Sequence, residues 1–253
     1  MTTLKTNAIE PEGATTNLVI GESGQNTVIR NLIRANVLQD SGGNAIFTSD
    51  GSGNMSGVDS QLGSAMILLS TQVATGNPAS IEFTSAITGA FTSTYKEYVF
   101  KWFDCNPSSN GQNIYFDTST DGGSSYSSVK TSSGFNASHT EGGTSPVLEN
   151  FHGNYRLENT AGGQHIGEGV GGGADENCAG ELHIINPAGT TYAKHYYGIS
   201  AVQEAYGGSA SGTIWWSSRF HGYVNSTANI DAVKFYWGGG THDSGTFKMW
   251  GIK

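Results

Sequence analysis

The sequence predicts an all-β protein: a short N-terminal β-stem followed by a C-terminal, jelly-roll-like β-sandwich head. Glycine supplies 37 of the 253 residues, about twice its average usage of ~7%. Its dipeptides interrupt the chain at short intervals, which is typical of many short strands joined by turns. Aromatic residues reach 11% while charged residues are held to 13%, so the chain has the side chains to build a packed core.

Residues 1–60 differ in texture from the rest. Apart from Phe47 they lack aromatic residues, and their short apolar segments alternate with Gly, Asn, Ser and Asp. One copy buries little with such short strands, so we expect a β-stem intertwined with other copies in a homo-oligomer, most simply a trimer. A helix also stays open for Val28–Gln39, because four apolar residues recur there at helical spacing: Val28, Leu32, Ala35 and Leu38.

The segment 50–64 is rich in Gly and Ser and predicts a hinge between stem and head. Residues 65–253 then hold a series of apolar or alternating runs separated by turn residues, as expected of strands. These candidate strands are 65–70, 80–85, 95–105, 112–119, 126–132, 147–159, 180–187, 193–202, 213–225, 230–237 and 246–252. So many short strands predict a two-sheet sandwich, with the jelly-roll as its expected form.

The last two candidate strands carry the strongest local pattern. Bulky residues occupy both faces of 230–237, which favours a position inside the sandwich. A glycine-dominated turn follows, and then Phe247, Met249 and Ile252 are expected in the core with Lys248 pointing outward. We expect this terminal hairpin to close the head.

Charge and hydropathy exclude several functions. The formal net charge is −9 and the basic residues form no run, which argues against a nucleic-acid ligand. No stretch of ~18 apolar residues predicts membrane insertion, and the start lacks the basic-then-apolar order of a secretory signal. A protein made in a cytoplasm is expected, with Cys105 and Cys178 buried as thiols rather than joined in a disulfide.

The residues predict neither a metal centre nor an enzyme. The 7 histidines show no H-x-x-x-H or H-E-x-x-H spacing, so neither a metal nor a cofactor is expected. Asp117 and Asp121 could share a cation, but a tight Asp-Gly turn is the favoured interpretation and a bound ion stays open. The acidic residues between Glu141 and Glu181 could serve a glycan-degrading spike. A nucleophile motif and a long repetitive body are missing, so a non-enzymatic protein is expected.

Several segments share one resemblance. They are residues 95–128 with their D-G-G-x-x-Y turn, residues 180–200 with their N-P turn, the opening TLKTNAIEPEG, the segment LQDSGGNAIFTSDGSGN, and the ending I-x-A-V-x-F-x-W followed by S-G-T-F-x-M-x-G-I. Together they resemble β-rich phage virion proteins, especially tail-fibre and appendage proteins of marine phages.

The resemblance implies a virion structural protein that is assembled in the host cytoplasm. It would be a tail fibre or fibre-like appendage, with its N-terminal segment bound to other virion proteins and its head attached to a host receptor such as a surface glycan. A capsid decoration or head-fibre protein that braces the shell is the alternative.

Receptor contacts are expected in the polar segments 136–144 and 162–177. Outward-facing aromatic residues could add to them, although packing between sheets or between subunits is the favoured use of these residues. Sugar rings stack on Trp and Tyr, while polar side chains bond their hydroxyl groups. Trp215 and Trp216 are adjacent, so in a strand one of them must face away from the core. The candidate contact residues are His139, Glu141, His165, Asp175, Asn177 and Trp216.

Overall fold

The computed structural model describes residues 37–39, 45–49, 52, 55–58, 65–144, 146–151, 155–204 and 214–253. The chain divides into two compact units, Met1–Gly63 and Ser64–Lys253. Their boundary falls inside the segment 50–64 that predicted a hinge. The described residues contain sixteen β-strands and no α-helix, which confirms the all-β prediction.

The first unit contains a small antiparallel sheet of three strands in the order β1-β2-β3. The strands are β1 (Val37–Gln39), β2 (Ala45–Ser49) and β3 (Met55–Val58). The segment Val28–Gln39, for which helix and strand stayed open, lies outside the described residues except for its last three, which are β1. The intertwined, oligomeric stem stays a prediction.

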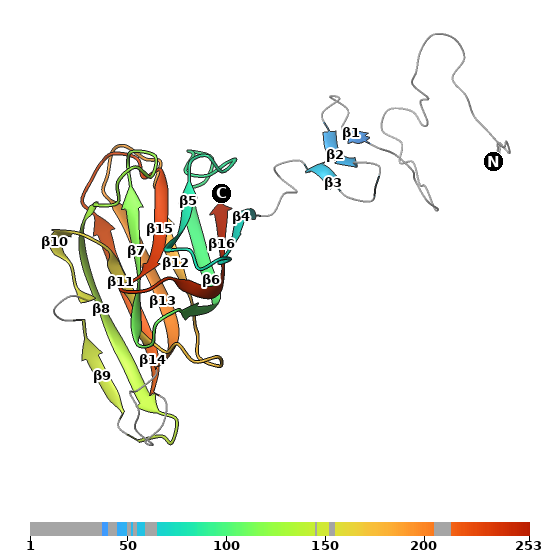
Figure 1. The fold of residues 1–253 in the computed structure, drawn as a ribbon. Helices are drawn as coiled ribbons and strands as arrows, with labels where there is room; N and C mark the ends of the chain where they lie inside the picture. The colour runs from blue at the N-terminus through green and yellow to red at the C-terminus, as the bar shows by residue number, and fades with distance from the viewer. Residues whose placement is uncertain are drawn as a thin grey trace, which may run out of the picture. The chain divides into compact units, whose positions relative to one another are not determined.

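The second unit is built from the remaining strands, whose arrangement in two layers can be followed in Figure 1. They are β4 (Met66–Val73), β5 (Ser80–Thr84), β6 (Glu97–Pro107), β7 (Gln112–Ser119), β8 (Val129–Thr140), β9 (Val147–Asn150), β10 (Glu158–Ala161), β11 (Gln164–Val170), β12 (Cys178–Ile185), β13 (Lys194–Glu204), β14 (Ile214–Val224), β15 (Ala232–Trp237) and β16 (His242–Ile252).

Eight of these strands have the connectivity of a jelly-roll. One sheet contains β4-β16-β6-β12 and the other β5-β15-β7-β11. Numbered one to eight along the chain, these strands have the orders 1-8-3-6 and 2-7-4-5, the pairing of two interlocked Greek keys. The jelly-roll prediction is therefore confirmed, and we call Ser64–Lys253 the jelly-roll unit.

Two insertions enlarge one of the sheets. Strands β13 and β14 follow β12, and β8 to β10 follow β7, so that the first sheet continues as β12-β13-β14-β8. Strands β9 and β10 pair with different parts of β8. We call this extended layer the large sheet and β5-β15-β7-β11 the small sheet. Between the small sheet and the large sheet, β11 and β13 pair at one position, where Val170 faces Glu204.

The terminal hairpin predicted from the sequence is wrong. Strand β15 lies between β5 and β7 of the small sheet, whereas β16 lies between β4 and β6 of the large sheet. Consecutive jelly-roll strands cross from one sheet to the other, and an apolar pattern specifies burial but not a pairing partner. Phe247 and Met249 are buried as predicted, but Ile252 is only partly buried, because the regular alternation of β16 continues the buried face with Gly251 and turns Ile252 to the other side.

The core between the sheets is largely aromatic. Phe235 of the small sheet contacts Phe100, Trp102 and Phe247 of the large sheet, with ring centroids 5.7, 5.8 and 5.3 Å apart. Each such pair adds about 0.5–1.5 kcal/mol beyond the burial of its surface. These contacts fix the spacing between the sheets beneath β6 and β16.

Cys105 and Cys178 face each other across β6 and β12. Both are buried and both are free thiols, as expected from the sequence. Burial raises the pKa of each thiol, so both are held in the protonated, unreactive form.

Candidate functional site

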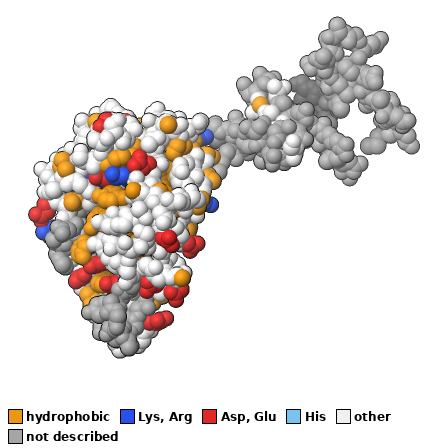
Figure 2. All heavy atoms as spheres, in the orientation of Figure 1, with side chains coloured by type: hydrophobic (Ala, Val, Ile, Leu, Met, Phe, Trp, Pro, Cys, Tyr) orange, Lys and Arg blue, Asp and Glu red, His pale blue; other side chains and the backbone are white. Residues whose placement is uncertain are grey.

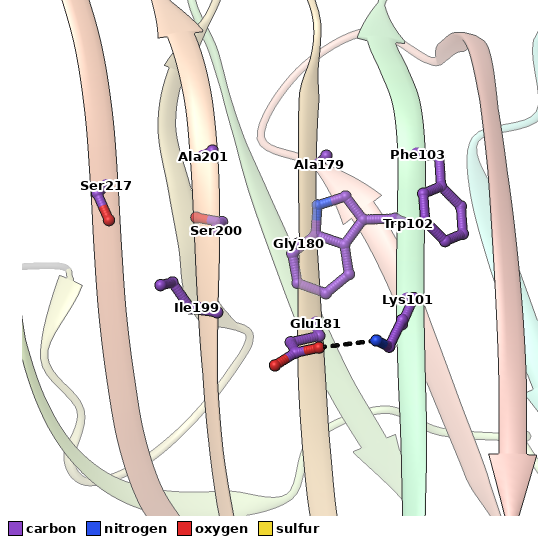
Figure 3. A pocket seen from close by; sticks show the side chains of 10 residues that line it. All are labelled: Lys101, Trp102, Phe103, Ala179, Gly180, Glu181, Ile199, Ser200, Ala201 and Ser217. Atoms are coloured by element: carbon purple, nitrogen blue, oxygen red, sulfur yellow. Dashed lines mark ion pairs between the residues drawn. The ribbon is translucent and has the colours of Figure 1, made fainter. Parts of the chain in front are cut away.

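The solvent-facing side of the large sheet carries a groove with a floor of small side chains. Ala179, Ala201, Ser217 and Ala137 are successive cross-strand partners on β12, β13, β14 and β8. Because these side chains are small, they leave space above the sheet. Larger side chains on the same face stand on either side of that space. Part of that space is a hollow of about 450 Å³ that extends from β6 to β14, and Figure 3 shows its lining residues.

Two rows of larger side chains form the banks of the groove. The first bank contains Lys101, Glu181, Ile199, Arg219 and Phe135, which are successive partners from β6 to β8. In the second bank Gln203, Trp215 and His139 are partners on β13, β14 and β8. Trp215 is 42% exposed and Phe135 is 39% exposed, so aromatic surface is available on both banks.

A β-bulge closes the β6 end of the groove. Cys178 pairs with Cys105 and Gly180 with Trp102, so the two residues Phe103 and Asp104 face the single residue between them on β12. Asp104 takes up the bulge with a φ of 52°. Such a bulge redirects side chains, and here it leaves the Phe103 ring 39% exposed beside the floor.

The charges of the first bank are partly paired. Lys101 Nζ lies 3.1 Å from Glu181 Oε2, and each side chain is 36% exposed; Figure 3 marks this ion pair. Partial burial raises the pKa of Glu181, but the bond to Lys101 and the nearby imidazole of His183 outweigh burial and lower it. Glu181 is therefore a carboxylate at neutral pH.

An aromatic stack lies beside the first bank. The His183 and Tyr197 rings are parallel, with centroids 4.6 Å apart and an interplanar angle of 10°. Glu97 bonds both groups, since His183 Nδ1 contacts its Oε1 and the Tyr197 hydroxyl donates to it over 3.3 Å. The stack is thereby fixed as a flat surface continuous with the bank.

Four of the sequence-predicted residues are exposed. His139 is a member of the second bank, and Asn177 extends the same bank because its carbonyl accepts a bond from the Gln203 amide over 3.2 Å. Glu141 lies in the turn after β8, and Asp175 lies in the turn before β12. The structure brings His139 and Asn177 to the groove but places Glu141 and Asp175 outside its banks.

His165 is a correction, because it does not lie in a polar loop. It belongs to β11 and is 0% exposed, with the Tyr155 and Tyr115 rings 4.3 and 5.6 Å away. Glycines on both sides of the segment indicated a loop, but pairing with β7 makes it a strand. Burial lowers the pKa of His165 to about 3, and the side chain is out of reach of a receptor.

Trp216 is a second correction. It is the inward member of the Trp pair, packs against the core and donates its indole N–H to Glu204 Oε2 over 2.5 Å. The exposed member is Trp215, which sequence reasoning missed. The sequence contained the information needed to choose between them. Phe220 and Val224 are apolar residues of the buried face of the strand, and Trp216 lies an even number of residues from both, so it faces the same side.

The two aspartates considered for an ion have separate protein partners. Asp117 bonds the Lys130 ammonium. Asp121 accepts bonds from the Ser119 and Ser125 hydroxyls, both over 2.6 Å, and these lower its pKa to about 2. The geometry is that of a hydrogen-bonded Asp-Gly turn.

The segment 171–177 is pinned to its surroundings. The buried Asn106 side chain donates to the carbonyls of Gly173 and Glu176 over 2.8 and 2.5 Å.

Within the described parts of the chain, no group of three or more His, Cys, Asp or Glu side chains is placed to hold a metal ion. No helix of those same parts is long and apolar enough to cross a membrane.

Comparisons with known proteins found no matching protein-family model, no matching curated protein and no matching solved structure. The groove itself therefore carries the functional argument.

Proposed function

We propose that the protein is a non-enzymatic virion component whose jelly-roll unit binds a host-surface glycan through the groove. The observation that carries the proposal is the floor of Ala179, Ala201, Ser217 and Ala137 between two banks with exposed aromatic side chains. The resemblance of the sequence to phage fibre and appendage proteins supplies the biological setting, with the first unit attaching the protein to the particle.

The dimensions of the groove suit a single sugar chain. Trp215 and Arg219 are four residues apart on β14 and stand on opposite banks, which separates their Cα atoms by about 13 Å. The floor crosses four neighbouring strands, a length of about 14 Å. A short run of linked rings fits this space, with Trp215 or Phe103 as the stacking surface and Gln203, His139 and Ser217 as partners for hydroxyl groups.

Weak binding at each groove is compatible with firm attachment. Copies held together in an oligomer raise the effective concentration of the remaining sites once one has bound, so avidity can exceed a single affinity by about 10²–10⁴. Light scattering on the full chain tests the oligomer, and a monomer would contradict the intertwined stem.

Filling the groove tests the proposed binding site. Ala201→Trp places an indole on the floor from an exposed position and should abolish binding to host-surface polysaccharide in calorimetric titrations while the protein stays folded. Ser93→Trp adds the same group at an exposed turn outside the groove and should bind normally. The proposal fails if the unaltered protein binds no host polysaccharide, or if both variants bind as well as it does.

Microscopy of labelled particles tests the virion setting. Labels on fibres or other discrete appendages agree with a host-attachment role. A lattice over the whole capsid would instead favour the bracing role of a decoration protein.

A further inference from the structure

Arg219 presents a guanidinium at the edge of the groove with no carboxylate partner among the described residues. It lies on β14 with an exposed side chain, and its cross-strand partners are Ile199 and Phe135. Its neighbours of the same face along the strand are Ser217 and His221. None of these is acidic, and no acidic residue in the described ranges forms an ion pair with Arg219.

This arrangement is unusual for an acidic protein. The chain has 12 basic against 21 acidic residues, and Figure 2 shows acidic side chains spread over the visible face with few basic ones. Two other charged side chains of the large sheet have partners, since Lys101 pairs with Glu181 and Glu97 with His183. Arg219 contributes no such bond to the fold, although Arg is the side chain best suited to bind a planar anion.

The same row gathers further positive charge. Lys248 of β16 is the cross-strand partner of Lys101, and like charges in this position repel each other. Lys248, Lys101 and Arg219 face only one carboxylate within the row, that of Glu181. The first bank and Lys248 together therefore carry a net positive charge beside a groove whose floor is built of small side chains.

We propose that the groove selects a glycan chain that carries carboxylate groups, as uronic acids do. This inference rests on the proposed function. Arg219 donates two parallel N–H bonds to the sugar carboxylate, Trp215 stacks on a ring from the opposite bank, and Ser217 lies between them on the floor. Lys101 and Lys248 add attraction for further carboxylates along the chain.

The size of the effect follows from the exposure of the site. Exposed ion pairs are weak and are screened by salt, so one guanidinium should favour an acidic over a neutral sugar by about two- to fivefold. The preference should fall as the ionic strength rises, whereas ring stacking should persist.

The experiment compares acidic oligosaccharides with their carboxyl-reduced forms. The probes are galacturonan, glucuronan and mannuronan oligomers and the same chains with each carboxylate reduced to a hydroxymethyl group, titrated into the full-length protein at low and high salt. At least one acidic chain should bind about two- to fivefold tighter than its reduced form. Arg219→Gln should remove the difference, and Arg219→Lys should retain part of it. Arg156→Gln makes the same charge change at a residue that pairs with Glu158 and should leave the difference intact.

The outcomes separate this inference from the proposed function. Equal binding of acidic and reduced chains, or an unchanged preference in Arg219→Gln, overturns the inference while the glycan-binding groove stands. If the protein binds neutral host polysaccharides and no acidic chain, the inference is likewise overturned and the glycan-binding groove stands. Failure of every acidic, reduced and host polysaccharide to bind overturns both.

Discussion

The Trp102 indole of the core lies against Gly180 and supports the floor of the groove from below. A Cβ atom on Gly180 would lie 2.3 Å from Trp102 Cζ2 and 2.6 Å from the Ile199 carbonyl oxygen, far inside van der Waals contact. Figure 3 shows the indole beside this position. Core packing and the shape of the candidate site are thus coupled at one glycine.

Gly180→Ala should destabilise the protein and distort the groove. The added methyl group meets a fully buried ring and a backbone atom, neither of which can yield without moving a strand. We expect a loss of about 1–3 kcal/mol in the free energy of unfolding, measured by urea denaturation. Ala179→Ser, on the solvent-facing side of the same strand, serves as the control and should change stability little. Equal stability of Gly180→Ala and the unaltered protein would show that the strands adjust freely.

Stability should fall in mild acid because of His165. Burial holds its folded-state pKa at about 3, below the ~6.5 of an unfolded histidine. The unfolded chain therefore binds the proton first. The contribution of His165 is complete above pH ~6.5 and is lost, at about 1.4 kcal/mol per pH unit, as the pH falls towards the folded-state pKa.

A second histidine acts in the same direction. Burial lowers the pKa of His242 to about 4, and its Nδ1 accepts the Trp237 indole N–H over 2.9 Å, a bond that protonation would break. In thermal melts between pH 6.5 and 4.5, His165→Phe should reduce the pH dependence by roughly half. The exposed His195→Phe should leave it unchanged. An identical pH profile for all three proteins would rule out His165 as the cause.

The buried ion pair of Lys130 and Asp117 should be costly to break from one side only. Their side chains are 0% and 3% exposed, and Lys130 also donates to the Gly162 carbonyl over 2.9 Å. Asp117→Asn leaves a buried cation without its partner, for which we expect a loss of about 3–5 kcal/mol. The double variant Asp117→Leu/Lys130→Met should lose much less than the sum of its single variants in a double-mutant cycle. Additive losses would mean that the two charges do not interact.

The sequence predicted what depends on local pattern. The alternation of apolar residues located most strands of the jelly-roll unit. The two-residue spacing of Phe247 and Met249 also identified the face of the last strand that is buried. Strand β11 was missed because a segment with few bulky residues becomes a strand only through its pairing with β7. Local pattern also could not assign β15 and β16 to opposite sheets.

The groove could not be predicted for a related reason. Its floor residues Ala137, Ala179, Ala201 and Ser217 belong to four strands and meet only through cross-strand register. Small residues at scattered positions carry no signal of their own. Histidine and tryptophan are candidate binding residues by their side-chain chemistry alone. The sequence therefore pointed to His139 on the second bank but not to the small residues of the floor.

The last strand should be essential for folding. Strand β16 pairs with β4 on one side and β6 on the other, so its removal would expose two strand edges and the cavity left by Phe247 and Met249. Deleting residues 246–253 should prevent the jelly-roll unit from folding, as judged by circular dichroism and protease resistance. A soluble, protease-resistant deletion protein would contradict this role.

Trp215 and Trp216 offer a matched pair for separating binding from stability. The same truncation to Ala is made one residue apart on β14, but Trp215 is 42% exposed on a bank of the groove, whereas Trp216 packs against the core. Trp215→Ala should weaken polysaccharide binding about tenfold or more, since a stacked ring contributes about 0.5–1.5 kcal/mol beyond its buried area. Its unfolding free energy should hardly change.

Trp216→Ala should show the opposite pattern. It removes core contacts and leaves Glu204 without its indole donor, so we expect a loss of about 2–4 kcal/mol in stability. Binding should be near normal at temperatures where the protein stays folded. Calorimetric titration and urea denaturation of both variants provide the measurements. If Trp215→Ala binds normally while Trp216→Ala, still folded, does not, the ligand lies on the inner side of β14 and the groove is not the site.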